Sequence, residues 1–457
     1  MIFIKIRGFH VIKFNVKLEN VGPIGKADMN LAQINIIGGQ NSTGKSTATK
    51  FLYSILRANS SKNKDVAYKS IMKKIAELVF DLNDYSRSNR ISMEDTEEQT
   101  QLKEDAFALL EKIVSADEFD EAKEVFDEVK RKYDKLVSKN ILKMDIEDQI
   151  DKIDNYIEKA ETKPEEIYFS VMETLLKREL SLDLGHLNEG CFTFTGEYND
   201  SEFKYVVDLN KDFNFDIGSV LSNPVGWFRV KEVYYMDSFS IIDLPQKEGL
   251  QNTDHASSLA KSLRPESDKS TDVYDKEDNP KLRELEESII ELMGGKFIFD
   301  GKKLVFKSKY EKISVMKNTA SGIKQLGIIQ ILLSHRAIDK DSFFILDEPE
   351  VNLHPIWQVE LAKFLVKLSK ELNLTLYVNS HSPFFIEALD LYSSYYGLIE
   401  NTRFFLTTPN NGKFDFVHVS HDNLDVIYRN LGEPYDMLDD IRLELEFGPV
   451  DDDLNEN

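Results

Sequence analysis

Three short apolar runs in this chain stop abruptly at polar residues. They are Ile34–Ile37, Phe343–Leu346 and Leu376–Val378. Continuous apolar runs of this length are typical of strands that are buried on both faces of a parallel sheet. A helical pattern over 47–56 follows the first run closely, as in a strand–turn–helix unit. We therefore predict an α/β fold whose ligands bind where these strands end.

Two pairs of alternating segments predict antiparallel strands in the same fold. One pair is Phe192–Thr195 with Phe203–Val207, and the other is Arg403–Thr407 with Phe414–Val419. A further strand is expected at Val233–Met236. The sheet should therefore be mixed.

The segment 58–184 is rich in Lys and Glu and carries apolar residues three or four positions apart, the pattern of amphipathic helices. We predict a helical insertion, and a short hairpin in preference to a long coiled-coil arm, because only a few heptads fit. Two interpretations fit this insertion: a surface for contacts with other subunits or a partner, and a lobe that packs on the rest of the chain. The expected domains are one head made of 1–57 and 185–457, with 58–184 inserted. The apolar positions are Phe119, Ala122, Phe126, Val129, Tyr133, Leu136, Ile146, Ile150, Ile153 and Ile157.

Beyond the insertion, residues 246–279 are polar and rich in charge, with Pro265 among them. This composition predicts a mobile connection. A helix is then expected over 281–293, and Gly294 and Gly295 mark its end.

The most specific motif is Gly39–Ser46, between the first apolar run and the first helix. Its glycines let backbone N–H groups turn toward phosphate oxygens, and the helix adds the positive end of its dipole. Lys45 is expected to reach the β- and γ-phosphates, and the Ser46 hydroxyl to bind Mg²⁺. This P-loop predicts ATP as the ligand, bound by Gly39, Gln40, Asn41, Ser42, Thr43, Gly44, Lys45, Ser46 and Thr47.

The second motif is Phe343–Leu346 followed by Asp347, Glu348, Pro349 and Glu350, a Walker B pattern. We expect Asp347 to hold the magnesium shell and Glu348 to polarise the attacking water as general base. An acidic strand end alone is more often a solvated turn or a helix cap. The P-loop in the same chain favours the catalytic interpretation.

Two weaker motifs lie on either side of this pattern. Asn318–Gln325 precedes a helical apolar pattern, and alone it predicts a helix start capped by Ser321. The strand Leu376–Val378 leads into Asn379–His381, and a lone histidine is most often structural. The order of the four motifs indicates instead that Ser321, Gly322 and His381 belong to the nucleotide site.

The segments Asp347–Pro355 and Ser380–Phe385, with the P-loop, resemble motifs of the ABC-type ATPases related to the SMC, RecF and OLD proteins. The similarity is greatest to the stand-alone OLD-like members of the AAA class, and it covers residues 1–56 and 233–387. It implies an ABC-type P-loop ATPase head, with a mixed sheet core and a β-subdomain, that binds ATP and Mg²⁺ between facing subunits. Each P-loop would meet Ser321 and Gly322 of the neighbouring subunit, and His381 would be the switch histidine at the γ-phosphate.

The same resemblance implies a homo-oligomeric molecular switch, at least a dimer. The signature Thr319–Ile323 departs from the Leu-Ser-Gly-Gly-Gln of transporters, which argues against fast turnover. The segment after His381 is too short for the Toprim nuclease domain of OLD proteins, so nuclease activity is expected on another polypeptide. The resemblance further implies that the switch controls a separate effector, as stand-alone OLD-like ATPases do in anti-phage defence. The effector would be a Toprim nuclease that is held until a phage protein triggers its release, as in PARIS-type systems, or an HNH nuclease, as in Septu-like systems. The alternative is a RecF- or SMC-like DNA-repair ATPase that clamps DNA.

Charge and cysteine content limit the kinds of partner and the cellular compartment that we expect. A net charge of −23 argues against DNA binding over the whole surface. The single cysteine, Cys191, and the lack of a signal or membrane segment predict a cytoplasmic protein without a membrane partner. The acidic segment 451–457 is expected to be disordered. A basic segment is either a DNA patch or the solvated side of a hairpin; its lysines are Lys302, Lys303, Lys307, Lys309, Lys312 and Lys317.

Overall fold

The computed structural model describes residues 13–58, 190–198, 201–209, 230, 232–243, 253–264, 280–300, 303–310, 312–315, 319–338 and 342–447, with scattered positions between 123 and 180. The chain divides into two compact units, Arg57–Leu175 and Met1–Leu56 with Leu176–Asn457. Positions described in the smaller unit are helical. Most of 58–184, where a hairpin was predicted, lies outside the described residues, as do the acidic segment 451–457, Lys302 and Lys317.

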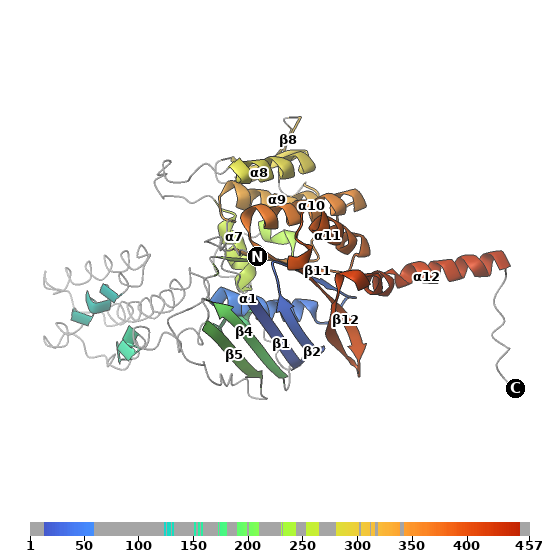
Figure 1. The fold of residues 1–457 in the computed structure, drawn as a ribbon. Coiled ribbons are helices and arrows are strands. Elements are labelled where there is room, and N and C mark those ends of the chain that lie inside the picture. The colour runs from blue at the N-terminus through green and yellow to red at the C-terminus, as the bar shows by residue number, and fades with distance from the viewer. Residues whose placement is uncertain are drawn as a thin grey trace, which may run out of the picture. The chain divides into compact units, whose positions relative to one another are not determined.

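In the described part of the larger unit, a ten-stranded mixed sheet has the order β5-β4-β1-β2-β13-β12-β3-β11-β10-β6. The first four of these strands lie side by side in Figure 1. The neighbours β12, β3, β11, β10 and β6 run parallel, whereas β1, β2, β4 and β5 pair antiparallel. The predicted α/β class with a mixed sheet is confirmed. The strands are β1 (Lys13–Val21), β2 (Ile24–Leu31), β3 (Ile34–Gly38), β4 (Gly190–Tyr198), β5 (Ser201–Leu209), β6 (Val233–Met236), β10 (Phe343–Asp347), β11 (Thr375–Ser380), β12 (Thr402–Asn410) and β13 (Lys413–Val419).

The register of the parallel strands positions the polar residues that follow them. Gly38 on β3 lies opposite Ser380 on β11, and Asn379 on β11 lies opposite Asp347 on β10. Because parallel strands end at the same edge of a sheet, the segments after β3, β10 and β11 meet there. Both predicted strand pairs are also confirmed, as β4 with β5 and β12 with β13.

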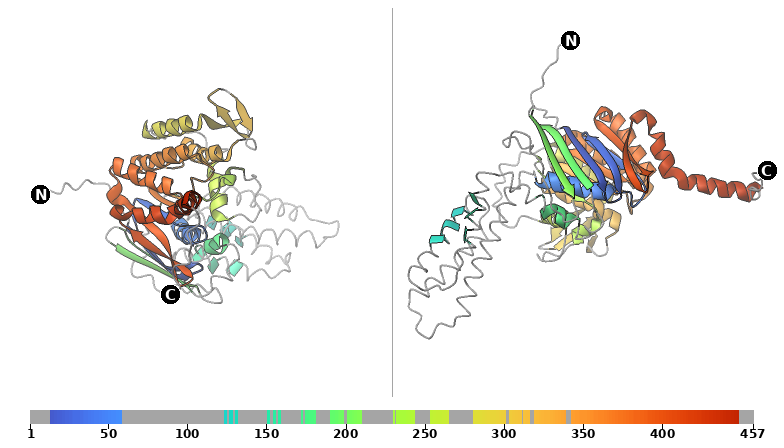
Figure 2. Two further views of the ribbon diagram at one scale, coloured as in Figure 1. Left: turned by 90° about the vertical axis from the view of Figure 1, so that its right-hand side faces the viewer. Right: turned by 90° about the horizontal axis from the view of Figure 1, so that it is seen from below.

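Two groups of helices pack on the sheet. Helix α1 (Lys45–Ala58) packs on the antiparallel strands (Figure 2). The centroid of the Phe51 ring on α1 lies 5.2 Å from that of Phe192 on β4. The second group lies together in Figure 1 and consists of α8 (Pro280–Met293), α9 (Ser321–Ser334), α10 (Pro355–Leu372) and α11 (Pro383–Tyr395).

None of the helices described combines the length and apolar composition needed to span a membrane.

The basic segment forms a separate three-stranded antiparallel sheet of β7 (Gly295–Asp300), β8 (Lys303–Ser308) and β9 (Ile313–Val315). This sheet approaches α9 so closely that a Cβ at Gly327 would lie 2.1 Å from the Phe297 ring. A third strand thus extends the expected hairpin. The described lysines on or beside these strands include Lys303, Lys307, Lys309 and Lys312.

The structure differs from the sequence expectations at three places. The connection expected over 246–279 contains a helix, α7 (Asp254–Ser262), which carries few apolar residues and so lacks a clear helical pattern. Ser321 is not the cap of α9, because Ala320 holds that position and makes no side-chain capping bond. A long helix, α12 (Asp425–Phe447), follows the second strand pair and was not expected.

Candidate nucleotide-binding site

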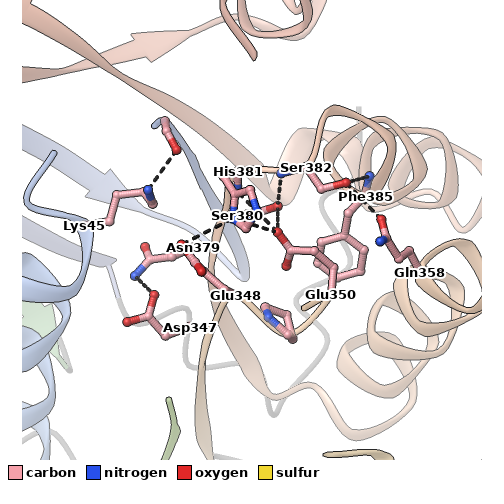
Figure 3. A network of polar contacts seen from close by, with 12 residues as sticks. Lys45, Asp347, Glu348, Glu350, Gln358, Asn379, Ser380, His381, Ser382 and Phe385 are labelled. Atoms are coloured by element: carbon pink, nitrogen blue, oxygen red, sulfur yellow. Dashed lines mark hydrogen bonds and ion pairs between the residues drawn. The ribbon is translucent and has the colours of Figure 1, made fainter. Parts of the chain in front are cut away.

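Residues from three separate motifs meet at the carboxyl edge of the parallel strands (Figure 3). Lys45 begins α1 shortly after β3, Asp347 and Glu348 lie at the end of β10, and His381 follows β11. These three strands are neighbours in the sheet. The structure therefore brings together the predicted P-loop, Walker B and switch residues.

Two glycines permit the conformation of the P-loop. A Cβ at Gly39 would lie 1.8 Å from Thr407 Oγ1 on β12. Gly44 has a φ of +96°, and its Cβ would lie 2.6 Å from Ile24 Cγ1. Ser42 also has a positive φ, 65°, a conformation that strains a residue with a side chain. The loop is therefore held in a shape that few other residues would allow.

The remaining loop residues differ in exposure. Gln40, Asn41 and Ser46 are exposed, while Thr47 is half-buried. The buried Thr43 hydroxyl donates to the Gln40 carbonyl at 3.0 Å and accepts from Thr407 Oγ1 at 3.0 Å. Thr43 thus braces the loop from inside, and the exposed residues remain accessible to a ligand.

Lys45 supplies a buried positive charge to this edge of the sheet. Its side chain is 4% exposed, and Nζ donates to the carbonyls of Gly39 at 2.8 Å and Gln40 at 2.7 Å. Burial lowers the pKa of Lys45, while the carboxylates of Glu348 and Asp347 act in the opposite direction. The ammonium group therefore lies between the loop and the acidic strand end.

Three donors hold the Asp347 carboxylate. Asn379 Nδ2 donates to Oδ1 at 3.0 Å, the Tyr235 hydroxyl donates to Oδ2 at 3.2 Å, and the Ser46 side chain also hydrogen-bonds to it. Burial raises the pKa of Asp347, and these hydrogen bonds oppose that rise. Asn379 also donates to Thr49 Oγ1 on α1 at 2.8 Å. The two predicted metal ligands, Ser46 and Asp347, are thus in contact.

Glu348 and His381 form an ion pair beside Asp347. His381 Nδ1 lies 3.3 Å from Glu348 Oε1. The hydrogen bond with His381 lowers the pKa of Glu348 and raises the pKa of His381, outweighing burial in each case. Glu348 has a φ of +51°, and its backbone N–H donates to the Asn379 carbonyl at 3.0 Å. The base candidate is therefore ionised and fixed in an unusual backbone conformation.

Glu350 is a buried carboxylate that anchors the segment after β11 (Figure 3). It accepts from Ser380 Oγ at 2.5 Å and from the His381 N–H at 3.2 Å, both on Oε1. Burial raises its pKa. Next along the chain, Ser382 caps α11 and donates to Gln358 Oε1 at 2.9 Å. These contacts fix the backbone that carries the His381 side chain.

Ser321 and Gly322 occupy a different place. At Gly322 a Cβ would lie 2.7 Å from Leu353 Cδ2 and 3.0 Å from the Asn352 carbonyl. Gln325, one turn further, donates to the Pro349 carbonyl at 2.7 Å. The atoms nearest to a Cβ at Gly322 belong to residues 352 and 353, whereas Lys45 contacts the carbonyls of Gly39 and Gln40. The start of α9 therefore packs on the segment after Glu348.

Four residues of this site were not predicted from the sequence: Tyr235, Glu350, Asn379 and Thr407. Glu350 and Asn379 lie within the motifs already named, and a polar residue at the end of a buried strand is a usable signal. Tyr235 and Thr407 lie within β6 and β12, far in sequence from the P-loop and from the Walker B segment. Nothing local identifies them.

The side chains at this edge fit a magnesium ion bound together with phosphates. Mg²⁺ takes oxygen ligands and usually keeps several waters, with one or two protein groups. Ser46 and Asp347 provide such oxygens. No group of three or more His, Cys, Asp or Glu side chains in the described part of the chain could hold a metal ion. Phosphate and water oxygens would complete the shell.

Comparisons with known proteins assign the family. No curated protein matches the chain. Among solved structures, the SMC head domain from Thermotoga maritima is 11% identical, covering 90% of this chain and 99% of that chain, with a TM-score of 0.38. An SMC head bound to the C-winged helix domain of ScpA is 12% identical, covering 89% and 97%, with a TM-score of 0.43. At these values neither adds to the family match. The AAA ATPase domain model (AAA_15) matches residues 12–386, which include every motif above, and the chain belongs to this family.

Proposed function

We propose that this protein is a magnesium-dependent ATPase that works as a molecular switch, closing a contact between copies of the chain with ATP and opening it on hydrolysis. The observation that carries the proposal is the convergence of Lys45, Asp347, Glu348 and His381 at one sheet edge. Membership of the AAA ATPase domain family supports ATPase activity.

The P-loop and α1 would bind the phosphates. Backbone N–H groups of 39–46 and the N-terminus of α1 favour an anion. Lys45 adds its charge at the β- and γ-phosphates. Ser46 and Asp347 would hold Mg²⁺, which neutralises charge on the phosphates when bound. Tyr235 and Asn379 keep the Asp347 carboxylate in place through its two oxygens.

Glu348 is suited to activate water. Its pKa is lowered by His381, so it is ionised near neutral pH and can accept a proton. The water oxygen bonds to the γ-phosphorus, the bond to the bridging oxygen breaks, ADP leaves, and the proton passes to Glu348. His381 orients Glu348 through their ion pair and, in its protonated form, directs positive charge toward the γ-phosphate.

The start of α9 supports a site shared between copies. This helix has no side-chain cap at Ala320, so its first N–H groups are suited to an anion. Gly322, which follows Ser321 in the first turn, packs beside Asn352 and Leu353. We infer that Ser321 and Gly322 contact the γ-phosphate held by a second copy, as in the ABC-type ATPases that the motifs resemble.

We further infer that the switch controls a separate effector, a Toprim or HNH nuclease, in anti-phage defence, with a phage protein as trigger. The support is the resemblance of Asp347–Pro355 and Ser380–Phe385 to OLD-like ATPases. One observation favours the alternative, a RecF- or SMC-like ATPase that clamps DNA. Lys303, Lys307, Lys309 and Lys312 gather on and beside the small sheet of an otherwise acidic protein.

The test uses Glu348→Gln, tagged and purified from the native host with its neighbouring genes present. We expect this variant to bind ATP while hydrolysing it about 10²-fold or more slowly, because the general base is lost. Native mass spectra with ATP and Mg²⁺ should then show an oligomer carrying a second protein in fixed stoichiometry. Unchanged turnover would remove Glu348 as the base. A dimer that carries DNA and no protein would favour the clamp.

A further inference from the structure

A buried charged cluster adjoins Tyr235, the residue that donates to Asp347. Its centre is His255 on α7, which is 1% exposed. His255 Nδ1 lies 2.5 Å from Glu179 Oε2, and its Nε2 lies 3.0 Å from Asp237 Oδ2. With a carboxylate on each ring nitrogen, both nitrogens must carry protons to donate. The imidazole is therefore a cation held between two anions.

The electrostatics of His255 agree with this geometry. Burial alone would lower the pKa of His255, but the hydrogen bonds with Asp237 and Glu179 raise it to about 9. Glu179 is completely buried, whereas the Asp237 side chain is 35% exposed. The charge of His255 is therefore permanent at neutral pH and balanced at both ends.

Glu179 also fixes the start of α7. Its Oε1 accepts from the His255 backbone N–H at 2.9 Å, near the N-terminus of the helix. Thr253, in the N-cap position, makes no side-chain capping bond. A carboxylate at a helix N-terminus satisfies a free N–H and interacts favourably with the dipole. One side chain thus holds both the backbone and the imidazole of His255.

His255 in turn packs on Tyr235. Their ring centroids are 4.3 Å apart with the planes tilted by 36°. Tyr53 packs on both, with centroids 5.9 Å from His255 and 5.7 Å from Tyr235. A cation over an aromatic ring is favourable, and more so away from water. Burial raises the pKa of Tyr235 well above its ordinary value, so its hydroxyl remains a donor.

We propose that His255, clamped by Glu179 and Asp237, is a positioning residue that fixes the Tyr235 ring and, through the Tyr235 hydroxyl, the Asp347 carboxylate for magnesium binding. This inference rests on the proposed ATPase function. Asn379 holds Oδ1 of Asp347 and Tyr235 holds Oδ2, so the pair sets the rotation of the carboxylate. Outer residues that orient a metal ligand in this way typically change metal affinity 10- to 100-fold when mutated.

The test measures the rate of ATP hydrolysis against free Mg²⁺ concentration in Tyr235→Phe and His255→Gln. Tyr235→Phe keeps the ring and removes only the hydroxyl, so it should fold. In both variants we expect the Mg²⁺ concentration that gives the half-maximal rate to rise about tenfold. Binding of a fluorescent ATP analogue in EDTA should not change, because the P-loop contacts remain.

The neighbouring tyrosine offers a matched control. The Tyr234 hydroxyl donates to the Ala337 carbonyl at 2.8 Å, a hydrogen bond without a part in holding Asp347. Tyr234→Phe therefore loses one partly buried hydrogen bond, as Tyr235→Phe does, and should leave the Mg²⁺ dependence unchanged. Thermal unfolding of both variants measures the structural loss separately.

The double variant Tyr235→Phe/His255→Gln tests whether His255 acts through Tyr235. If so, its Mg²⁺ dependence matches that of Tyr235→Phe alone, because a shared path makes the effects non-additive. Parental Mg²⁺ dependence in either single variant, Tyr235→Phe or His255→Gln, overturns the positioning role while the ATPase function stands. Additive effects overturn the route through Tyr235. A parent protein without Mg²⁺-dependent hydrolysis overturns the proposed function, and the inference with it.

Discussion

At the scale of single residues, His381 and Glu348 make the charge state of the site depend on pH. The hydrogen bond with Glu348 raises the pKa of His381 above its ordinary value of 6.5, so the protonated form stabilises the fold. That contribution is fully present below the ordinary pKa and is lost as pH rises through the raised one. Glu348 stays ionised across this range, because its own pKa is lowered.

His381→Gln should therefore destabilise the protein more at pH 6 than at pH 9. The expected loss at pH 6 is at most about 1 kcal/mol, because both side chains are partly exposed to solvent. Urea denaturation of parent and variant at the two pH values measures the difference. A loss that grows with rising pH would contradict the assignment of a charged His381 paired with Glu348.

At the scale of elements, the contact between α9 and residues 352–353 depends on Gly322. An added methyl group would lie 2.7 Å from Leu353 Cδ2 and 3.0 Å from the Asn352 carbonyl, so one side must move. Gly322→Ala should lower the free energy of unfolding by about 1–3 kcal/mol, the usual effect of overpacking. Urea denaturation measures the change.

Gly432→Ala is the control for this change. Gly432 lies in α12, where an added Cβ would meet nothing within 4 Å. Ala favours a helix over Gly by about 1 kcal/mol, so this variant should be neutral or slightly more stable. Equal destabilisation by both substitutions would show that the contact with Leu353 does not matter.

The elements around the site differ in how far the sequence determines them. Strands β3, β10 and β11 were predictable because each is a continuous apolar run that ends in a motif. Helix α7 was not, since only His255, Leu259 and Ala260 of its residues are buried, and Glu179 holds its N-terminus from far away in the chain. Local patterns do not record such contacts.

The residues of the site also differ in how far the sequence predicts them. Lys45, Asp347 and Glu348 belong to motifs with fixed spacing, so they could be named from sequence alone. Their partners Tyr235 and Thr407 are set by the order of strands in the sheet, which brings β6 beside β10 and β12 beside β3. The sequence predicts the chemical groups, whereas their supporting contacts require the topology.

At the scale of the whole molecule, shared ATP sites make a prediction for mixed oligomers. Lys45→Ala should remove phosphate binding, and Ser321→Arg should block the γ-phosphate contact offered to a neighbour, so each variant alone should be inactive. In a mixed dimer, one site combines the intact Lys45 of one copy with the intact Ser321 of the other. Equal co-expression makes about half of the dimers mixed, each with one of two sites intact, so about a quarter of parental activity should return.

The ATPase rate of the co-expressed variants measures this recovery, with the two chains tagged differently to confirm mixing. The control pairs Ser321→Arg with the double variant Lys45→Ala/Ser321→Arg. No dimer in that mixture has an intact Ser321, so no activity should return. If Lys45→Ala and Ser321→Arg mix without recovery, or if Ser321→Arg alone hydrolyses ATP like the parent, each site lies within one chain. The contact between α9 and residues 352–353 would then serve only the packing of that chain.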